Sequence, residues 1–388
     1  MKKTLWMLGV AVAALTSCTQ SEVLDVPENQ IISFEPFVDK ATRTADLKSE
    51  TLSKFYTFGA YSAANGENFN ATNDGESLFS ATEATMTKVG ETNVYSYPDA
   101  ERWIMDQYYH FAGYSDGNNS LISSVSFFSN QDLTVQTGED GQGGITTNTH
   151  SNAWGLEITD YTASTNDLIA AVPLEYETVN DRPTQPDVNM TFKHLLSKIA
   201  FHFSYNKNVA QADRFMRIKT FDVDAIKKAS CKVFYYEMGG YTYVDWDSQF
   251  KILSEVDNDK QGKYTFFDSD GVNDEDGWKT IDKNENEDLL IHFIEEDAYV
   301  IPQKTTGLVI PLIEVETYYK DGGNIEVTKV DKYTNVSLEI PDHIYWKPGY
   351  VYRYSATLTP GQQSIVFTAS VDPWIDEANR DYQIQNGQ

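Results

Sequence analysis

Hydrophobic and polar residues alternate along much of the chain. In the segment Ile31 to Val38, Ile32 and Phe34 fall on one side and Ser33 and Glu35 on the other. Successive side chains of a strand point to opposite faces, so a period of two is typical of strands. The pattern predicts an antiparallel β protein whose sheets each have one face toward water. The same alternation, or a short apolar run, occurs at Leu168 to Pro173, Met190 to Phe203, Tyr352 to Leu358 and Ile365 to Val371.

Two pairs of expected strands are separated by short glycine-rich segments. One contains Gly239 and Gly240, and the other is Asp321-Gly322-Gly323. Tight turns between antiparallel strands need backbone conformations that glycine adopts easily, so each segment predicts a hairpin. The expected partners are Val233 to Glu237 with Tyr241 to Trp246, and Val309 to Tyr319 with Ile325 to Val330.

Only Val209 to Met216 and Glu377 to Tyr382 have the pattern of short helices. Polar stretches interrupt the strands, and Asp268 to Asp288 is the best candidate for a domain junction. A chain of 388 residues exceeds the roughly 250–300 residues at which a single core stops growing. We therefore expect two antiparallel β-sandwich domains, residues 44–285 and 286–388.

The charge balance excludes one large class of partner. Lys and Arg total 30 against 58 Asp and Glu, a formal net charge of -28. A polyanion is repelled by phosphate backbones, so we expect no nucleic-acid partner. It is also repelled by an anionic membrane surface unless something anchors it. The two cysteines are too few for a disulfide framework or a cysteine-rich zinc site.

The N-terminus has the pattern of a bacterial lipoprotein signal. Lys2 and Lys3 precede an apolar run from Leu5 to Leu15, which is too short to span a bilayer. The run ends in Leu15-Thr16-Ser17-Cys18, where a small residue stands before a cysteine. The pattern predicts a signal peptide of residues 1–17 and a lipid on the thiol of Cys18, which anchors the protein without spanning the membrane. The alternative is an ordinary signal peptide cut nearby, with Cys18 incidental.

The sequence offers little chemistry for catalysis. The acidic segment Asp268 to Gly277 fails as an EF-hand, because Val272 falls on a ligand position whether the loop starts at Asp268 or Asp270. A calcium site of another kind remains the alternative to a solvated acidic loop. The six histidines lack metal-ligand spacing, and no nucleophile-elbow or phosphate-loop motif occurs. We expect no enzyme activity, cofactor or metal. A hydrolase with paired carboxylates stays open, because such a pair is defined only in space.

Arg43 lies between small residues in the segment Ala41-Thr42-Arg43-Thr44-Ala45, just after the first expected strand. Exposed segments of small residues are preferred sites of proteolysis. An arginine-specific protease would cut between Arg43 and Thr44 and separate the strand next to the lipid from the rest of the chain. Residues 18–43 are therefore expected to be a propeptide.

Four segments together resemble the fimbrillin family of Bacteroidota, the major and minor subunits of type V pili. They are Leu15 to Cys18, the segment around Arg43, Phe192 to Ile199, and Tyr345 to Tyr350. The resemblance implies two transthyretin-like β-sandwich domains in tandem. It also implies a lipidated precursor in the outer membrane, cleavage after an arginine by an arginine-specific protease, and assembly with other fimbrial subunits by strand exchange into surface fimbriae. A host or bacterial surface ligand is a further expected partner.

Strand exchange gives Ile31 to Val38 the role of a plug, with Ile32 and Phe34 facing the groove that it fills. Its release would expose apolar surface and unpaired backbone groups, which a strand from another subunit can cover. Such head-to-tail contacts do not close, so they build a filament. Ile375 to Gln388 holds few apolar residues and makes a weak donor strand, which leaves a stalk, tip, anchor or accessory role open. The alternative function is a surface glycan-binding lipoprotein that does not polymerise.

Overall fold

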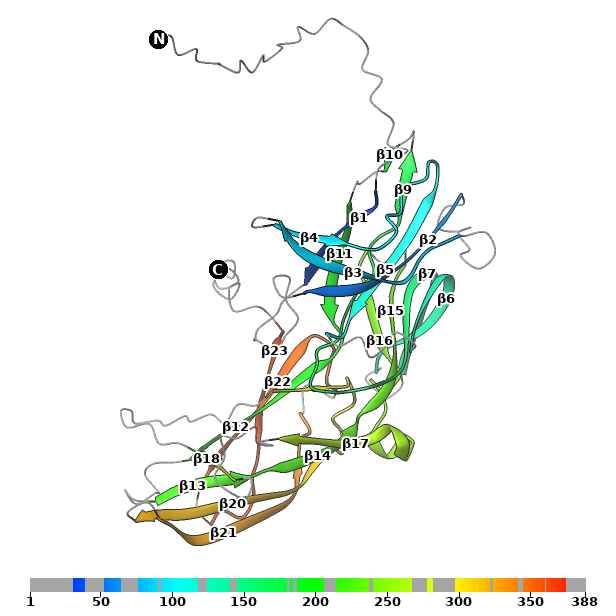
Figure 1. Cartoon of the computed structure of the whole chain (residues 1–388). Coiled ribbons are helices and arrows are strands. Elements are labelled where there is room, and N and C mark those ends of the chain that lie inside the picture. The colour runs from blue at the N-terminus through cyan, green and yellow to red at the C-terminus, as the bar shows by residue number, and fades with distance from the viewer. Residues whose placement is uncertain are drawn as a thin grey trace, which may run out of the picture.

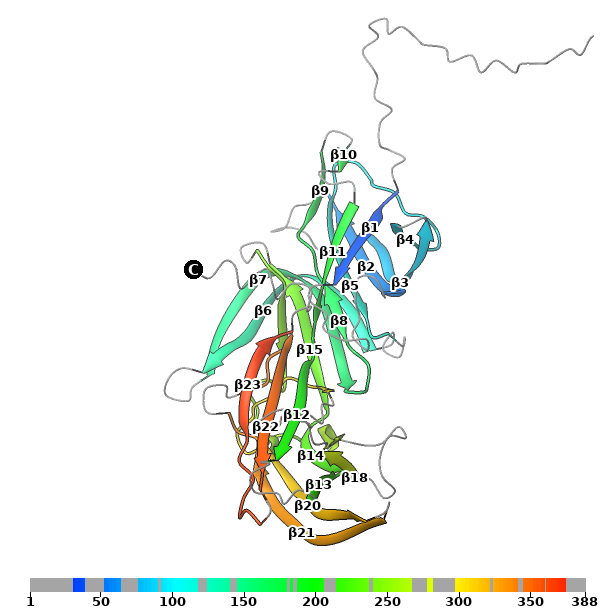
Figure 2. The same ribbon diagram turned by 90° about the vertical axis from the view of Figure 1, so that its left-hand side faces the viewer.

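The computed structural model consists almost entirely of β-strands, which confirms the predicted all-β class. Residues 31–38, 52–63, 76–89, 92–117, 124–139, 145–179, 182–183, 187–205, 214–236, 240–266, 278–281, 297–321, 324–340, 345–359 and 361–374 are described. The strands form two groups of sheets, one above the other in Figure 1, and the same two groups are seen after a 90° turn in Figure 2.

The upper group begins with a nine-stranded sheet. The path through it runs from β1 at one edge to β4 at the other, and these two strands also contact each other. The sheet is therefore strongly curled around its inner face. Its strands, in spatial order, are β1 (Ser33–Val38), β11 (Asp187–His194), β8 (Ile169–Ala171), β5 (Tyr108–Ser115), β2 (Lys54–Ser62), β3 (Glu76–Val89) and β4 (Thr92–Ser96), with β9 (Tyr176–Val179) and β10 (Arg182–Pro183) off this path.

A second sheet of the upper group covers the outer face of the first. Along β5, Phe111 points to the inner face, whereas Ala112 and Tyr114 point outward and share a core with Leu156 and Val233 of the second sheet. The central strands of the nine-stranded sheet, β2, β5 and β8, are thus buried on both faces. The second sheet runs β16 (Tyr243–Trp246), β15 (Lys228–Tyr235), β7 (Ile145–Thr162) and β6 (Val125–Glu139).

The lower group packs around an aromatic centre. The ring centroid of Phe201 lies 5.0 Å from that of Phe221, 4.7 Å from that of Phe266 and 5.4 Å from that of Tyr354. One of its sheets runs β19 (Asp297–Val300), β12 (Ser197–Tyr205), β22 (Tyr350–Leu358) and β23 (Thr368–Pro373). Another runs β18 (Trp278–Ile281), β13 (Arg214–Lys219), β20 (Val309–Asp321) and β21 (Asn324–Ser337), and a pair is formed by β14 (Phe221–Ile226) and β17 (Gln261–Phe266).

The structure confirms both predicted hairpins, since β15 pairs with β16 and β20 pairs with β21. It corrects the single strand expected from Met190 to Phe203, which is two strands in different sheets. The break falls at Leu195 and Leu196, where the amide of Leu195 donates to the carbonyl of Leu168 and the carbonyl of Leu196 accepts from the amide of Gly349. Both residues are apolar and buried, so the pattern alone continues through the break.

The helix predicted over Val209 to Met216 is wrong where it can be compared. Residues from Arg214 onward belong to β13, which pairs with β20. Met216 and Ile218 are buried on one face, and Arg217 between them forms an ion pair with Glu316 of β20. Cross-strand packing therefore overrides the local preference. The helix expected over residues 377–382 lies outside the described residues.

The sheets do not divide at residue 285. β12 and β13 precede that position, yet they pair with β22 and β20, which follow it. β15 pairs with β7 in the upper group and carries β16 on its other side. The division into domains 44–285 and 286–388, like the transthyretin-like topology, stays a prediction.

Candidate functional site

The strand β1 lies at the edge of the nine-stranded sheet and joins it in an unusual way. It runs parallel to β11, in register from Ser33 opposite Asp187 to Val38 opposite Phe192. On its other side β11 pairs with β8 only at Lys193 and His194. Along most of β11, β1 is therefore the one strand partner among the described residues. Its removal would leave the backbone groups on this side of β11 without a strand partner.

The inner side chains of β1 fill an aromatic pocket. Ile32, Phe34 and Val38 are buried in the core that lines the inner face of the curled sheet. The ring centroid of Phe34 lies between 5.4 and 6.0 Å from those of four other rings, mostly edge-on. Burial of an aromatic side chain of this size is worth about 1.5–3 kcal/mol, and edge-to-face contacts add to that. The four rings are those of Phe55, Phe79, Tyr97 and Phe111.

Polar contacts hold Ser33, the first residue of β1, and Ile32 directly before it. The amide of Ile32 donates to the carbonyl of Glu101 at 2.9 Å, and the hydroxyl of Tyr97 donates to the carbonyl of Ile32 at 2.7 Å. The Ser33 hydroxyl donates to the carboxylate of Asp187. Burial raises the pKa of Tyr97 to about 12, so its hydroxyl stays a donor at any physiological pH. β1 is thus anchored at its first residues as well as through Phe34.

The outer face of β1 is open. The Phe37 side chain is 57% exposed, and Ile31 is also exposed. Pro36 has no amide hydrogen, and proline within a sheet is tolerated mainly on edge strands. β1 is therefore held by one face, one edge and its first residues.

Of the predicted site residues, the structure describes Ile32 and Phe34. Ile32 and Phe34 lie together on the buried side of β1. Cys18, Arg43 and Thr44 lie outside the described residues, as does the acidic segment Asp268 to Gly277. The roles assigned to these residues stay predictions.

Sequence reasoning missed the residues that receive Phe34. They come from β2, β3 and β5 and from Tyr97 just after β4. Alternation within each strand predicts that a ring is buried, but it says nothing about which other rings it meets. Only the curling of the sheet brings these segments together.

The described residues contain no group of three or more His, Cys, Asp or Glu side chains that could hold a metal ion. His110 contacts Ser129 and Glu175 and stacks on Trp154 at 4.0 Å between ring centroids. Burial lowers its pKa, and the Glu175 carboxylate opposes that shift, so His110 is a packed, neutral core residue. Burial, with Asp245 and Asp247 nearby, raises the pKa of the Cys231 thiol and makes it a poor nucleophile. No helix in the described part of the chain is long and apolar enough to cross a membrane.

A model of the fimbrillin-like family matches residues 42–374. The chain therefore belongs to the fimbrillin-like family. One similar solved structure is a fimbrial protein from Bacteroides vulgatus, with 13% identity and a TM-score of 0.50 over 89% of this chain and 100% of that chain. Another, from Bacteroides uniformis and described as a candidate cell adhesion protein, has 13% identity and a TM-score of 0.41 over 90% of this chain and 99% of that chain. No protein with a curated description matches.

The family match confirms the resemblance drawn from the sequence motifs. At 13% identity, the Bacteroides vulgatus structure shows the fold alone. Membership in a family of fimbrial proteins also agrees with the expectation that the chain is not an enzyme.

Proposed function

We propose that this protein is a subunit of surface fimbriae whose first strand, β1, is an exchangeable plug. The observation that carries the proposal is the position of β1. It is an edge strand with its aromatic side chain buried in a ready-made pocket, and it ends at Val38, just ahead of Arg43. A cut between Arg43 and Thr44 separates it from the rest of the fold.

The physical logic of the plug follows from tethering. While β1 is joined to β2 through a short connection, it binds its groove at high effective concentration, and a strand from another subunit cannot compete. Cleavage removes that advantage. The empty groove then presents the aromatic pocket and the unpaired edge of β11, which favour capture of a strand from another subunit.

The precursor would reach its site of assembly as a lipoprotein. The signal pattern before Cys18 supports lipidation of that thiol and anchorage in the outer membrane, facing the cell surface. An arginine-specific protease at the surface would then both release the subunit from its anchor and open its groove. Cys18→Ala should abolish labelling with a palmitate analogue. Unchanged labelling would place the lipid elsewhere.

The test of the proposal is the N-terminus of the assembled form. Surface filaments that contain this protein should be purified, and mass spectrometry should find a chain that begins at Thr44. Arg43→Ala should accumulate as an uncut precursor that stays out of filaments. Lys40→Ala is the matched control, because it removes a nearby cation that an arginine-specific protease does not read. A filament form that still begins at Cys18, or an Arg43→Ala protein that assembles normally, would contradict the proposal.

A further inference from the structure

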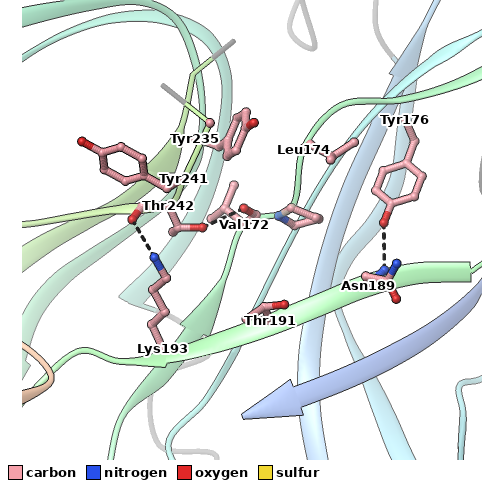
Figure 3. Close-up of a pocket in the computed structure, with 11 residues that line it drawn as sticks. Val172, Leu174, Tyr176, Asn189, Thr191, Lys193, Tyr235, Tyr241 and Thr242 are labelled. Carbon is pink, nitrogen blue, oxygen red and sulfur yellow. Dashed lines mark hydrogen bonds between the residues drawn. The ribbon is translucent and has the colours of Figure 1, made fainter. Parts of the chain in front are cut away.

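A cavity of about 380 Å³ opens where the outer face of β11 meets the hairpin β15–β16 (Figure 3). Its floor is the segment Val172-Pro173-Leu174 that follows β8. None of the residues that line it belongs to β1. It does not belong to the groove described above.

One wall of the cavity is polar. Asn189, Thr191 and Lys193 alternate along β11 with residues buried in the inner core, so all three point outward into the cavity. An amide, a hydroxyl and an ammonium group therefore stand in a row along one strand. Together they offer both donors and acceptors of hydrogen bonds.

The frame of the cavity is held by hydrogen bonds through Thr242. Its hydroxyl donates to the carbonyl of Val172 at 3.0 Å, and its carbonyl accepts from the Lys193 ammonium at 3.2 Å (Figure 3). The hairpin is thus tied both to the floor and to the polar wall. Such a preformed site needs little reorganisation to bind a ligand.

The opposite wall is aromatic. It carries Tyr235 and Tyr241, with Leu174 at the rim. Tyr241 is 56% exposed and Leu174 is also exposed, so both are accessible to a ligand at the edge of the cavity. The Tyr241 ring stacks on Tyr243, 4.3 Å between centroids, and Tyr235 packs on Trp154. Both rings are therefore held in place at the edge of the cavity.

Tyr241 also lines a second cavity, of about 420 Å³, next to the first. There a hydrogen bond of 3.1 Å connects the hydroxyls of Tyr236 and Tyr243, and the Tyr236 ring packs on His150. Besides these rings, the polar side chains of this second cavity are three amides and one carboxyl group. They are Gln136, Asn148, Gln249 and Asp245.

We infer that the two cavities and the Tyr241 ring between them form a binding site for an oligosaccharide. A sugar ring has an apolar face of C–H groups that packs on aromatic rings, and a rim of hydroxyls that suits amide and hydroxyl side chains. The lining supplies both features on facing walls. Two cavities that share one exposed ring fit linked sugar units better than a single small molecule.

Other ligand classes fit less well. An apolar ligand would offer no hydrogen bonds to the polar wall of β11, so covering that wall would cost free energy. A polyphosphate would meet a single lining cation on a chain of net charge -28. A saccharide needs neither an apolar wall throughout nor a cluster of cations.

The experiment uses the full uncut chain, so its result does not depend on strand exchange. A glycan array holding neutral and acidic oligosaccharides identifies the tightest binder, and calorimetry then compares that oligosaccharide with its component monosaccharides. We expect Tyr241→Ala to weaken binding at least tenfold and Tyr241→Phe, which keeps the ring, to change it less than threefold. Asn189→Ala should weaken it several-fold. Val366→Ala, at an exposed site in the lower group, is the matched control and should bind as wild type.

Three results would overturn the inference. The first is an array on which no saccharide binds the wild-type chain. The second is unchanged affinity in a folded Tyr241→Ala protein, with the fold checked by its circular dichroism spectrum. The third is a monosaccharide that binds as tightly as the oligosaccharide, which would show that the two cavities do not bind one ligand together. None of these results bears on cleavage at Arg43, so the proposed fimbrial function stands or falls separately.

Discussion

Two parallel strand pairs stand out in this otherwise mostly antiparallel protein, and they are built differently. In the upper group β1 pairs with β11 at the edge of a sheet. In the lower group β22 pairs with β12 on one side and with β23 on the other. Both bury large aromatic side chains, Phe34 in the first pair and Phe201 with Tyr354 in the second.

The difference between the pairs is in what would remain after a strand is lost. Without β22, the sheet of the lower group would be split and its aromatic core opened. Without β1, the rest of the nine-stranded sheet keeps every other strand pairing. We propose that the chain uses the same kind of pairing once as a permanent part of a core and once as a contact that can be undone.

The largest expected effect is in the permanent pair. Phe201→Ala should lower the free energy of unfolding by about 3–5 kcal/mol, because it removes a fully buried ring that contacts five other rings. Urea unfolding measures the change. Phe37→Ala, on the exposed face of β1, is the matched control and should stay within about 0.5 kcal/mol of wild type. A loss confined to one sheet would show that the lower group is less cooperative than its shared core implies.

A smaller and more local effect is expected in the exchangeable pair. Phe34→Ala should weaken the attachment of β1 by about 2–4 kcal/mol, because its aromatic pocket is left partly empty. Proteolysis after Arg43 should accelerate, while the lower group keeps its protection from hydrogen exchange. Equal loosening of β12 and β22 would contradict the separation of the two pairs.

A third prediction concerns a buried carboxyl group that lies outside both strand pairs. Burial raises the pKa of Asp245 on β16 to about 6, with Lys232 opposing and Asp247 adding to the shift. Above pH 6 the Asp245 carboxylate is ionised in both the folded and the unfolded chain, and only the folded chain bears the cost of burying that charge. Asp245→Asn should stabilise the fold by about 1–2 kcal/mol at pH 8.

The gain should shrink as the pH falls through 6 and vanish below the ordinary aspartate pKa of about 4, where both folded and unfolded chains are protonated. Thermal unfolding from pH 4 to pH 8 measures it. Asp132→Asn, at an exposed carboxylate of β6 in the same sheet, is the control. A pH-independent gain would show that the effect comes from packing rather than from charge.

The smallest expected effect concerns a single hydrogen bond to β1. Tyr97→Phe removes the hydroxyl that donates to the carbonyl of Ile32, which should weaken the attachment of β1 by about 0.5–1.5 kcal/mol. The ring, and its contact with Phe34, is kept. Hydrogen exchange of β1 should quicken while global stability changes little. If β1 exchanges at the wild-type rate, the anchor at its first residues is unimportant.

Local pattern predicted much of the fold. Alternation marked Ile31 to Val38 as a strand, and glycines marked both hairpins, because side-chain direction and turn conformation are set by a few neighbouring residues. The break at Leu195 and Leu196 could not be seen, since both residues are apolar and are fixed by hydrogen bonds to residues far along the chain.

The candidate site was predicted only in part. Alternation predicted that Ile32 and Phe34 lie on one side of a strand before Arg43, and both are buried there. The role of that strand as a plug stays a proposal. Residues far apart in the sequence form both the pocket and the cavities. The rings that receive Phe34 come from residues 55 to 111, and the linings of the cavities around Tyr241 come from residues 135 to 249. Neither is visible without the sheet order.

The most direct test of the plug mechanism is hydrogen exchange at single amides, before and after an arginine-specific protease is added to the full chain. We predict that cleavage releases β1 and that β11 amides within Val188 to Phe192 then exchange at least about 100-fold faster. Asn189 is an internal reference, because its amide donates to the Tyr176 hydroxyl. The amides of Phe201 and Phe203 in β12 should keep their protection. If β11 keeps its protection after the cut, or if β12 loses as much as β11, β1 is not an exchangeable plug.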